Sequence, residues 1–127
     1  MTDAAKRTLY GSPRPDGQTP FWRMQTLWAA AEGKDPVAVR LDELNILDEV
    51  VWFGGPKDVL PTVRRVAERA RDIFAAELSY PIIMTADGAI LDGAHRIARA
   101  YLQGVSTLPA VVIDGLPEPD GYVVASA

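Results

Sequence analysis

The sequence contains no cysteine and a single histidine, His95. The lack of cysteine excludes disulfide bonds, thiol catalysis and metal sites built from thiolates. There is also no long apolar run and no signal-peptide pattern, so we expect a cytoplasmic protein that makes no use of a membrane. The chain also has no excess of positive charge, since its net charge is −4 and its isoelectric point is about 4.9. Since proteins that bind duplex DNA usually present a basic face, we expect no specific duplex-DNA ligand.

The remaining composition is that of an ordinary globular chain, with 127 residues of which 48% are hydrophobic. A chain of this length is expected to form one domain and can bury a core without covalent staples. Its first nineteen residues are rich in proline, glycine and small polar side chains. We therefore predict a flexible N-terminal arm over 1–19 and a single domain over 20–127.

The most informative stretch of the sequence reads PIIMTADGAILDGAHRIARAYLQG. Two short apolar segments flank Asp87-Gly88, a dipeptide typical of a hairpin turn because glycine tolerates positive φ. Asp92-Gly93 then ends the second segment, and apolar residues recur at helical spacing as far as Gly104, which suits a helix C-terminus. The stretch predicts strands at 82–84 and 89–91, followed by a helix over 94–103.

Outside this stretch, hydrophobic periodicity predicts two further helices and several strands. Thr19 and Pro20 are suited to begin the first helix, and Pro61 is suited to the first turn of the second. The expected helices cover 20–32 and 61–78, and the expected strands lie at 37–44, within 46–55, at 108–113 and at 122–124.

Both of these helices are amphipathic. The first has an aromatic stripe that includes Phe21 and Trp28, which is more typical of a core or a partner surface than of a cofactor site. The second is expected to pack on the sheet through its apolar face, which comprises Val63, Val66, Ala67, Ala70, Ile73 and Phe74. Its four arginines are best interpreted as a solvated face, with a phosphate or nucleic-acid surface as the alternative.

His95 and Arg96 fall in the first turn of the helix that follows Gly93. Backbone N–H groups point outward at such a position and the helix dipole is positive, so cations are unfavourable there unless an anion lies between. Phosphate is the usual anion, and Gly93 would let the backbone approach it closely. The alternative is that Arg96 pairs with a nearby carboxylate while His95 only caps the helix.

The order of these elements resembles the ParB N-terminal/sulfiredoxin-like superfamily. The resemblance covers about 37–113 and rests on the strand, Asp-Gly turn, strand, Asp92-Gly93-Ala94-His95-Arg96 and helix, followed by a further strand. It implies an α/β fold of the α+β type, with a small mixed sheet flanked by helices, to which this chain adds an N-terminal helix. In that superfamily the glycine-containing turn holds nucleotide phosphates, which here implies a binding role for Gly93, Ala94, His95 and Arg96.

Two known activities of the superfamily do not transfer to this sequence. Sulfiredoxins use a cysteine within the turn, and Ala94 occupies that position here. Chromosome-partitioning ParB proteins read DNA through a helix-turn-helix domain that follows, and we expect none because few residues come after Ile113. Free-standing members include kinases for free serine that carry an Asp-Gly-x-His-Arg turn, and Asp92, Gly93, His95 and Arg96 match that form.

The resemblance to these kinases implies catalytic roles for three residues. His95 would donate to a phosphate oxygen or transfer a proton, and Asp92 would hold Mg²⁺ or accept a proton from the substrate. Glu49 lies near the place where related kinases carry a base, so it is a third catalytic candidate. The implied cofactors are a nucleoside triphosphate or diphosphate of the ATP, ADP or CTP type, together with Mg²⁺. The simpler interpretation of Asp92 is a helix N-cap. Since asparagine caps about as well as aspartate, we expect Asp92→Asn to leave stability almost unchanged, while turnover is lost if Asp92 is catalytic.

The leading hypothesis is a small nucleotide-binding protein that acts as a kinase for a serine-type small molecule or as a nucleotide phosphohydrolase. A non-catalytic module that senses a nucleotide or docks a partner protein is the alternative from another class. A weaker alternative is a ParB-like nuclease. The sequence leaves open which nucleotide binds and whether the chain forms a homodimer.

Overall fold

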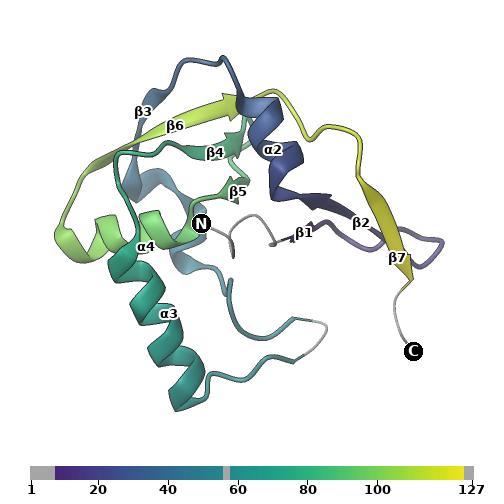
Figure 1. Ribbon diagram of the computed structural model, residues 1–127, viewed down its shortest axis with the longest axis horizontal. Coiled ribbons are helices and arrows are strands. Elements are labelled where there is room, and N and C mark those ends of the chain that lie inside the picture. The colour runs from purple at the N-terminus through teal and green to yellow at the C-terminus, as the bar shows by residue number, and fades with distance from the viewer. Residues whose placement is uncertain (1–7, 56–57, 125–127) are drawn as a thin grey trace.

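The computed structural model describes residues 8–55 and 58–124 and has a mixed α/β architecture (Figure 1). The described residues form three α-helices, a three-stranded antiparallel sheet and a four-stranded mixed sheet. Figure 1 shows the four-stranded sheet between α2 and α4, whereas the three-stranded sheet extends to one side. The first seven residues of the predicted arm lie outside the described residues.

The four-stranded sheet has the order β3-β6-β4-β5. Its central strands β4 (Ile82–Thr85) and β6 (Thr107–Ile113) run parallel, and α4 (Ala94–Gln103) lies between them in the chain. The outer strands β3 (Val37–Arg40) and β5 (Ile90–Asp92) are antiparallel to their neighbours. These elements confirm the strands predicted near 82–84, 89–91 and 108–113, the helix predicted over 94–103, and the start of the strand predicted over 37–44.

The predicted Asp87-Gly88 turn joins β4 to β5. Gly88 has a φ of 99°, which glycine adopts without steric cost, and the amide of Thr85 donates to the carbonyl of Ala89 at 2.9 Å. The hydroxyl of Thr85 donates to the carboxylate of Asp87 and lowers the pKa of that carboxyl group. The turn therefore has both the backbone and the side-chain contacts of a closed hairpin.

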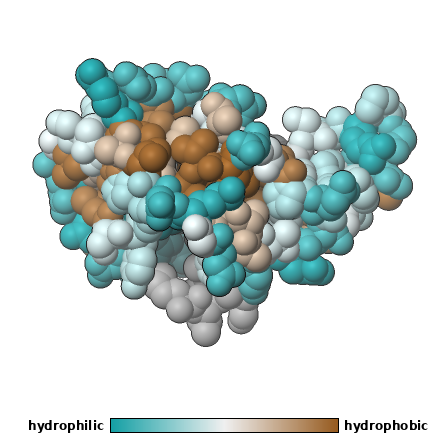
Figure 2. All heavy atoms as spheres, turned by 90° about the horizontal axis from the view of Figure 1, so that it is seen from above, coloured by the Kyte–Doolittle hydropathy of each residue, from teal (hydrophilic) through white to brown (hydrophobic). Residues whose placement is uncertain are grey.

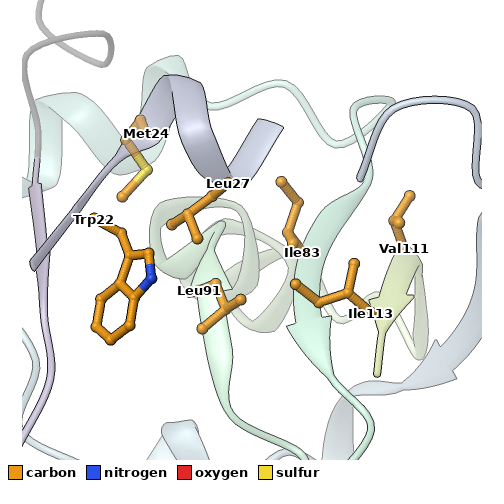
Figure 3. Close-up of a cluster of buried hydrophobic side chains, with 7 residues drawn as sticks. All are labelled: Trp22, Met24, Leu27, Ile83, Leu91, Val111 and Ile113. Carbon is orange, nitrogen blue, oxygen red and sulfur yellow. The ribbon is translucent and has the colours of Figure 1, made fainter. Parts of the chain in front are cut away.

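Alternate residues of the central strands face opposite sides of the four-stranded sheet. Ile83 and Val111 belong to the core under α2 (Met24–Ala31), where Leu27 is completely buried (Figure 3). Their chain neighbours Ile82 and Ala110 belong to a second core under α4, together with Ile97, Ala100 and Leu108. The sheet is thus covered on both faces, which accounts for the near-continuous apolar run of β6.

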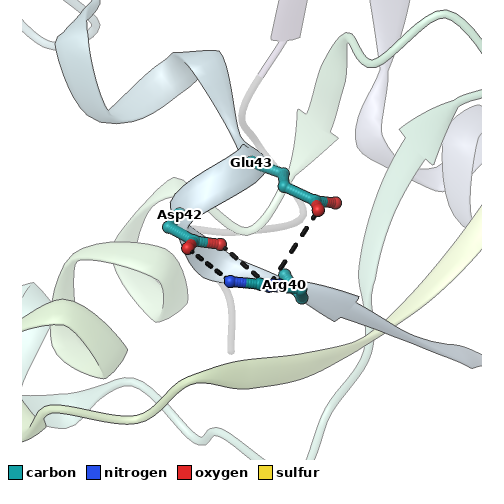
Figure 4. Close-up of polar contacts among 3 residues, drawn as sticks. All are labelled: Arg40, Asp42 and Glu43. Atoms are coloured by element: carbon teal, nitrogen blue, oxygen red, sulfur yellow. Dashed lines mark hydrogen bonds and ion pairs between the residues drawn. The ribbon is translucent and has the colours of Figure 1, made fainter.

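Two short 3₁₀ turns complete the core on the α4 side. These turns are η1 (Leu41–Glu43) and η2 (Asn45–Asp48), and the core contains Leu41 and Leu44. Arg40, at the end of β3, pairs with Asp42 at 2.7 Å and with Glu43 at 3.9 Å (Figure 4). These side chains are well exposed, so the contacts raise the pKa of Arg40 but contribute little to stability.

The helix predicted over 20–32 is wrong in its first part. Residues Gln18–Arg23 form the strand β2, which pairs with β1 (Thr8–Tyr10) on one side and with β7 (Gly121–Val124) on the other. The bulky aromatic residues of β2 suit a strand, and Trp22 donates through its indole N–H to the carbonyl of Pro117 at 2.8 Å. Because β1 and the start of β2 fall within 8–19, the described part of the predicted arm is not a free chain.

The strand predicted within 46–55 is also wrong. Its first residues form η2, and Val50 and Val51 are exposed and unpaired in the sheets that the described residues form. Residues with high β-propensity form a strand only where a neighbouring strand can pair with them. In the four-stranded sheet of the described residues, the edges are β3 and β5, and the segment 46–53 pairs with neither of them.

The second predicted helix is present as α3 (Val63–Ala75), but it does not pack on the sheet as expected. It contacts α4 and projects from the body of the molecule (Figure 1). None of its residues is buried. The physical reason is that α4, η1 and η2 already cover this face of the sheet, which leaves α3 no apolar surface on which to pack.

The face of the molecule that carries α2, opposite α3, is apolar at its centre. Figure 2 looks down on this face and shows apolar residues gathered between hydrophilic ones. A shallow groove here is lined by residues of α2 and of the strands beside it, including Trp28, Ala31, Ile83 and Val111.

Among the helices in the described ranges, none has both the length and the apolar character needed to span a membrane.

The helix α2 begins without a side-chain cap of its own, and Asp120 provides the missing contacts. One carboxylate oxygen of Asp120 accepts from the backbone N–H of Arg23 at 2.7 Å, and the hydroxyl of Thr26 donates to both oxygens. The amide of Asp120 also donates to the carbonyl of Phe21 at 2.9 Å. A negative charge at a helix N-terminus is favourable, so Asp120 joins the end of the chain to the first turn of α2.

We predict that Asp120→Ala lowers the urea midpoint of unfolding at neutral pH, whereas Asp114→Ala, at another exposed loop position, does not. The hydrogen bonds from Arg23 and Thr26 lower the pKa of Asp120, so its stabilising effect is present above the unfolded pKa of about 3.9. That effect is lost as the pH falls through the lower folded pKa. The difference between wild type and Asp120→Ala should therefore shrink in acid, and a difference that grew in acid would contradict the capping role.

Candidate functional site

The candidate site lies where β5 passes into α4, and the turn there depends on Gly93. Gly93 is buried and has a φ of 120°, a conformation that other residues rarely adopt. A Cβ atom at this position would lie 2.5 Å from Cγ2 of Ile82 and 3.3 Å from its Cα. Since Ile82 is fully buried in β4, it has no room to move aside. Glycine is therefore required for α4 to begin this close to the sheet.

No side chain at the N-cap position covers the first turn of α4. The amide of Ile97 bonds to the carbonyl of Gly93 at 3.0 Å and closes the first intrahelical turn. Asp92 is not the N-cap that the simpler interpretation expected, because Gly93 occupies that position. The backbone N–H groups of this turn and the positive end of the helix dipole therefore favour an anion.

Asp92 takes part in a buried polar network next to this turn. Its side chain is 7% exposed, and its Oδ2 atom lies 3.2 Å from Nη2 of Arg96, whose side chain is 15% exposed. The indole N–H of Trp28, from α2, donates to the same oxygen at 2.9 Å. The network thus connects β5, α4 and α2 through one carboxylate oxygen.

The other nitrogen at the end of the Arg96 side chain is also engaged. Nη1 of Arg96 donates to the carbonyl of Pro81 at 2.8 Å and to that of Tyr80 at 3.2 Å. These carbonyls belong to the segment just before β4. Arg96 therefore pairs with a nearby carboxylate, as the alternative interpretation of the sequence predicts. It also holds the segment that leads into β4.

His95 lies between an aromatic ring and an arginine. Its imidazole stacks on the indole of Trp52, with ring centroids 4.9 Å apart and an angle of 20° between the planes. Nη1 of Arg69, from α3, lies 3.3 Å from Nε2 of His95. Because a guanidinium can only donate, this hydrogen bond requires a lone pair on Nε2. The contact therefore suits a neutral imidazole whose proton is on Nδ1.

The remaining predicted site residues are Ala94 and Glu49, which belong to different elements. Ala94 is the first residue of α4 and lies within the candidate anion site. Glu49 follows η2 and has an exposed side chain. Its role as a base stays a prediction, as do the binding roles of Gly93, Ala94, His95 and Arg96.

The implied Mg²⁺ finds no ready set of ligands in the described residues. Within that part of the chain, no three His, Asp or Glu side chains gather in a way that could hold a metal ion. Asp92, the predicted ligand, already accepts from Trp28 and pairs with Arg96. The donor set therefore does not fit a metal ion held by Asp92, and we derive no chemical step through one.

Sequence reasoning missed three residues of the site: Trp28, Trp52 and Arg69. Trp28 was expected in an apolar stripe, and only its indole N–H reveals the link to Asp92. Arg69 is one of four similar arginines on its helix, and only the contact between α3 and α4 sets it apart. The sequence predicts a strand at Trp52, and nothing in that pattern indicates stacking on His95. These contacts join segments far apart in the sequence, so no local pattern predicts them.

Comparison with known proteins adds no assignment. No family model, no curated protein and no solved structure matches this chain.

We predict that Asp92→Asn lowers the free energy of unfolding by about 3 kcal/mol, because it leaves a buried arginine without its carboxylate. Trp28→Phe keeps the aromatic ring but loses one donor, and should cost about 1 kcal/mol. Asp114→Asn, at an exposed position, should change stability by less than about 0.5 kcal/mol. Urea denaturation of the three variants measures these values. A loss below about 1 kcal/mol for Asp92→Asn would contradict a structural role for the ion pair and restore the earlier expectation of a silent change.

Proposed function

We propose that the protein has a ParB/sulfiredoxin-like fold and binds the phosphate groups of a nucleotide at the N-terminus of α4. The proposal for the fold is supported by the order of the elements. A β4–β5 hairpin runs through Gly93 into α4, and the chain then returns as β6, parallel to β4. This is the arrangement that the resemblance implies.

One observation carries the functional proposal: α4 begins directly against the sheet at a position where only glycine fits. A side chain at position 93 would displace Ile82, and glycine leaves the N-cap position without a side-chain cap. Because no N-cap side chain accepts from the N–H groups of the first turn, these groups can donate to an anion. Backbone N–H groups at a helix N-terminus bind phosphate without any requirement for a particular side chain.

Arg69 is the cation best placed to assist this site. Its contacts with His95 and Asp72 within the described residues both use Nη1. The edge formed by Nε and Nη2 therefore remains for a bidentate contact with a phosphate group. Arg96, the residue expected to hold phosphate, is committed to Asp92 and to two carbonyls. We accordingly assign the phosphate contact to Arg69 instead of Arg96.

The geometry supports binding better than turnover. A general base needs access to the proton that it removes, and Asp92 is buried within an ion pair. His95 keeps a lone pair on Nε2, but Arg69 uses it. We therefore favour the nucleotide-binding module over the kinase or phosphohydrolase.

We predict that Arg69→Ala weakens the binding of ATP, CTP or pyrophosphate about tenfold or more, because a charge-assisted hydrogen bond contributes about 1.5–3 kcal/mol. Isothermal titration calorimetry of wild type and variant measures the change. Arg71→Ala is the matched control: it removes the same charge from the same helix at an exposed position, and should change affinity less than about twofold because exposed charges are screened.

Product analysis in the same samples separates binding from catalysis. The proposal predicts saturable binding with no phosphate release and no transfer to serine. Release or transfer by wild type would favour the enzyme instead. If no phosphate compound binds, or if Arg71→Ala weakens binding as much as Arg69→Ala does, the proposed site is wrong.

A further inference from the structure

The chain leaves the core after Leu47 and returns to it at Leu78, and none of the described residues between them is buried. Leu47 and Leu78 both pack against the core under α4. The described residues between them are 48–55 and 58–77, and they include α3. Because burial of apolar side chains is the main source of local stability, this excursion is held to the body more weakly than the strands of the sheet are held to one another.

Only the second half of α3 lies against the body. Residues 63–68 are all exposed, whereas the half-buried residues of the helix, such as Arg69 and Ile73, come later. Figure 1 accordingly shows the last turns of α3 beside α4 and its first turn away from the body. Nη1 of Arg99, from α4, donates to the carbonyl of Ala76 just after the helix. A helix of thirteen residues is marginally stable in water by itself, so α3 depends on these few contacts to remain folded.

Two parts of the excursion meet at His95, in the first turn of α4. The indole of Trp52 stacks on the imidazole ring, and Nη1 of Arg69 donates to Nε2 of the same ring at 3.3 Å. The ring must keep one orientation to make both contacts. The contact with Trp52 therefore supports the contact with Arg69, and the reverse is also true.

Hydrogen bonds within the excursion connect the segment of Trp52 to α3. The amide of Gly54 donates to the carbonyl of Val59 at 2.7 Å, and the amide of Val59 donates to the carbonyl of Gly54 at 3.1 Å. Nη1 of Arg65, from α3, donates to the carbonyl of Leu60 at 3.1 Å. None of these bonds involves α4, so they can persist when the excursion separates from it.

We propose that α3 and the segment 48–55 form a lid that opens and closes as one unit while both sheets remain folded. In the closed state Trp52 and Arg69 contact His95. In the open state both contacts are broken together, and the first turn of α4 becomes more accessible to solvent. The lid follows from burial and from contacts within the chain, so it does not depend on whether that turn binds phosphate.

Native-state hydrogen exchange, followed by NMR, measures the opening of each region separately. The lid predicts one opening constant for the amides in the second half of α3 and for those of Gly54 and Val59. This constant should exceed the opening constant of β4 and β6 by about a hundredfold or more. The proposal is overturned if α3 opens only together with the strands, or if Gly54 and Val59 open with a constant different from that of α3.

The substitution His95→Phe tests whether His95 holds both parts of the lid. Phenylalanine keeps a ring for Trp52 to stack on but offers no acceptor to Arg69, and loss of that charge-assisted hydrogen bond should raise the opening constant of the lid about tenfold. Because the lid opens as one unit, the amides of Gly54 and Val59 should show the same rise as those of α3, although their segment loses no contact of its own.

The matched control is Tyr101→Phe, which places the same residue at an exposed position on another side of α4. It should change the opening constant of the lid by less than about twofold, as is usual for an exposed site. A rise confined to α3 in His95→Phe would show two independent parts and contradict the lid. An equal rise in β4 and β6 would show that His95 stabilises the whole fold, and would contradict it too.

Discussion

The ion pair between Asp92 and Arg96 is almost excluded from water, and three parts of the chain are attached to it. The indole N–H of Trp28 connects α2 to Asp92. The carbonyls of Tyr80 and Pro81 accept from Arg96 and connect it to the segment before β4. The cost of burying two charges is high, and it is offset only when the remaining hydrogen-bonding capacity is also used. Here the guanidinium of Arg96 donates to two carbonyls, and the carboxylate of Asp92 accepts from an indole N–H.

The position of α4 depends on this network and on Gly93. The glycine allows the helix to begin against Ile82, and the ion pair holds the residues on either side of the turn. Between them they set the direction of the helix axis relative to the sheet. If an anion binds there as proposed, the N–H groups of the first turn are already held in place, which reduces the entropy lost on binding.

The sequence predicted well those elements whose signals are local. The Asp87-Gly88 turn, Gly93 and Gly104 mark the hairpin and the limits of α4, because each glycine has a backbone conformation that other residues avoid. The strand β2 could not be foreseen, since its partners β1 and β7 come from near the opposite ends of the described chain. The same holds at the site, where His95 was found by its position in the helix, whereas Arg69, Trp52 and Trp28 approach from other elements.

Amide chemical shifts provide the most direct test of the central claim that the first turn of α4 is a preorganised anion site. Pyrophosphate is titrated into isotopically labelled protein while the backbone resonances are followed. We predict saturable shifts at the amides of Ala94, His95 and Arg96, with smaller changes near Arg69. Shifts confined to the arginines on the outer face of α3, or no saturable shift at these three amides, would contradict the account.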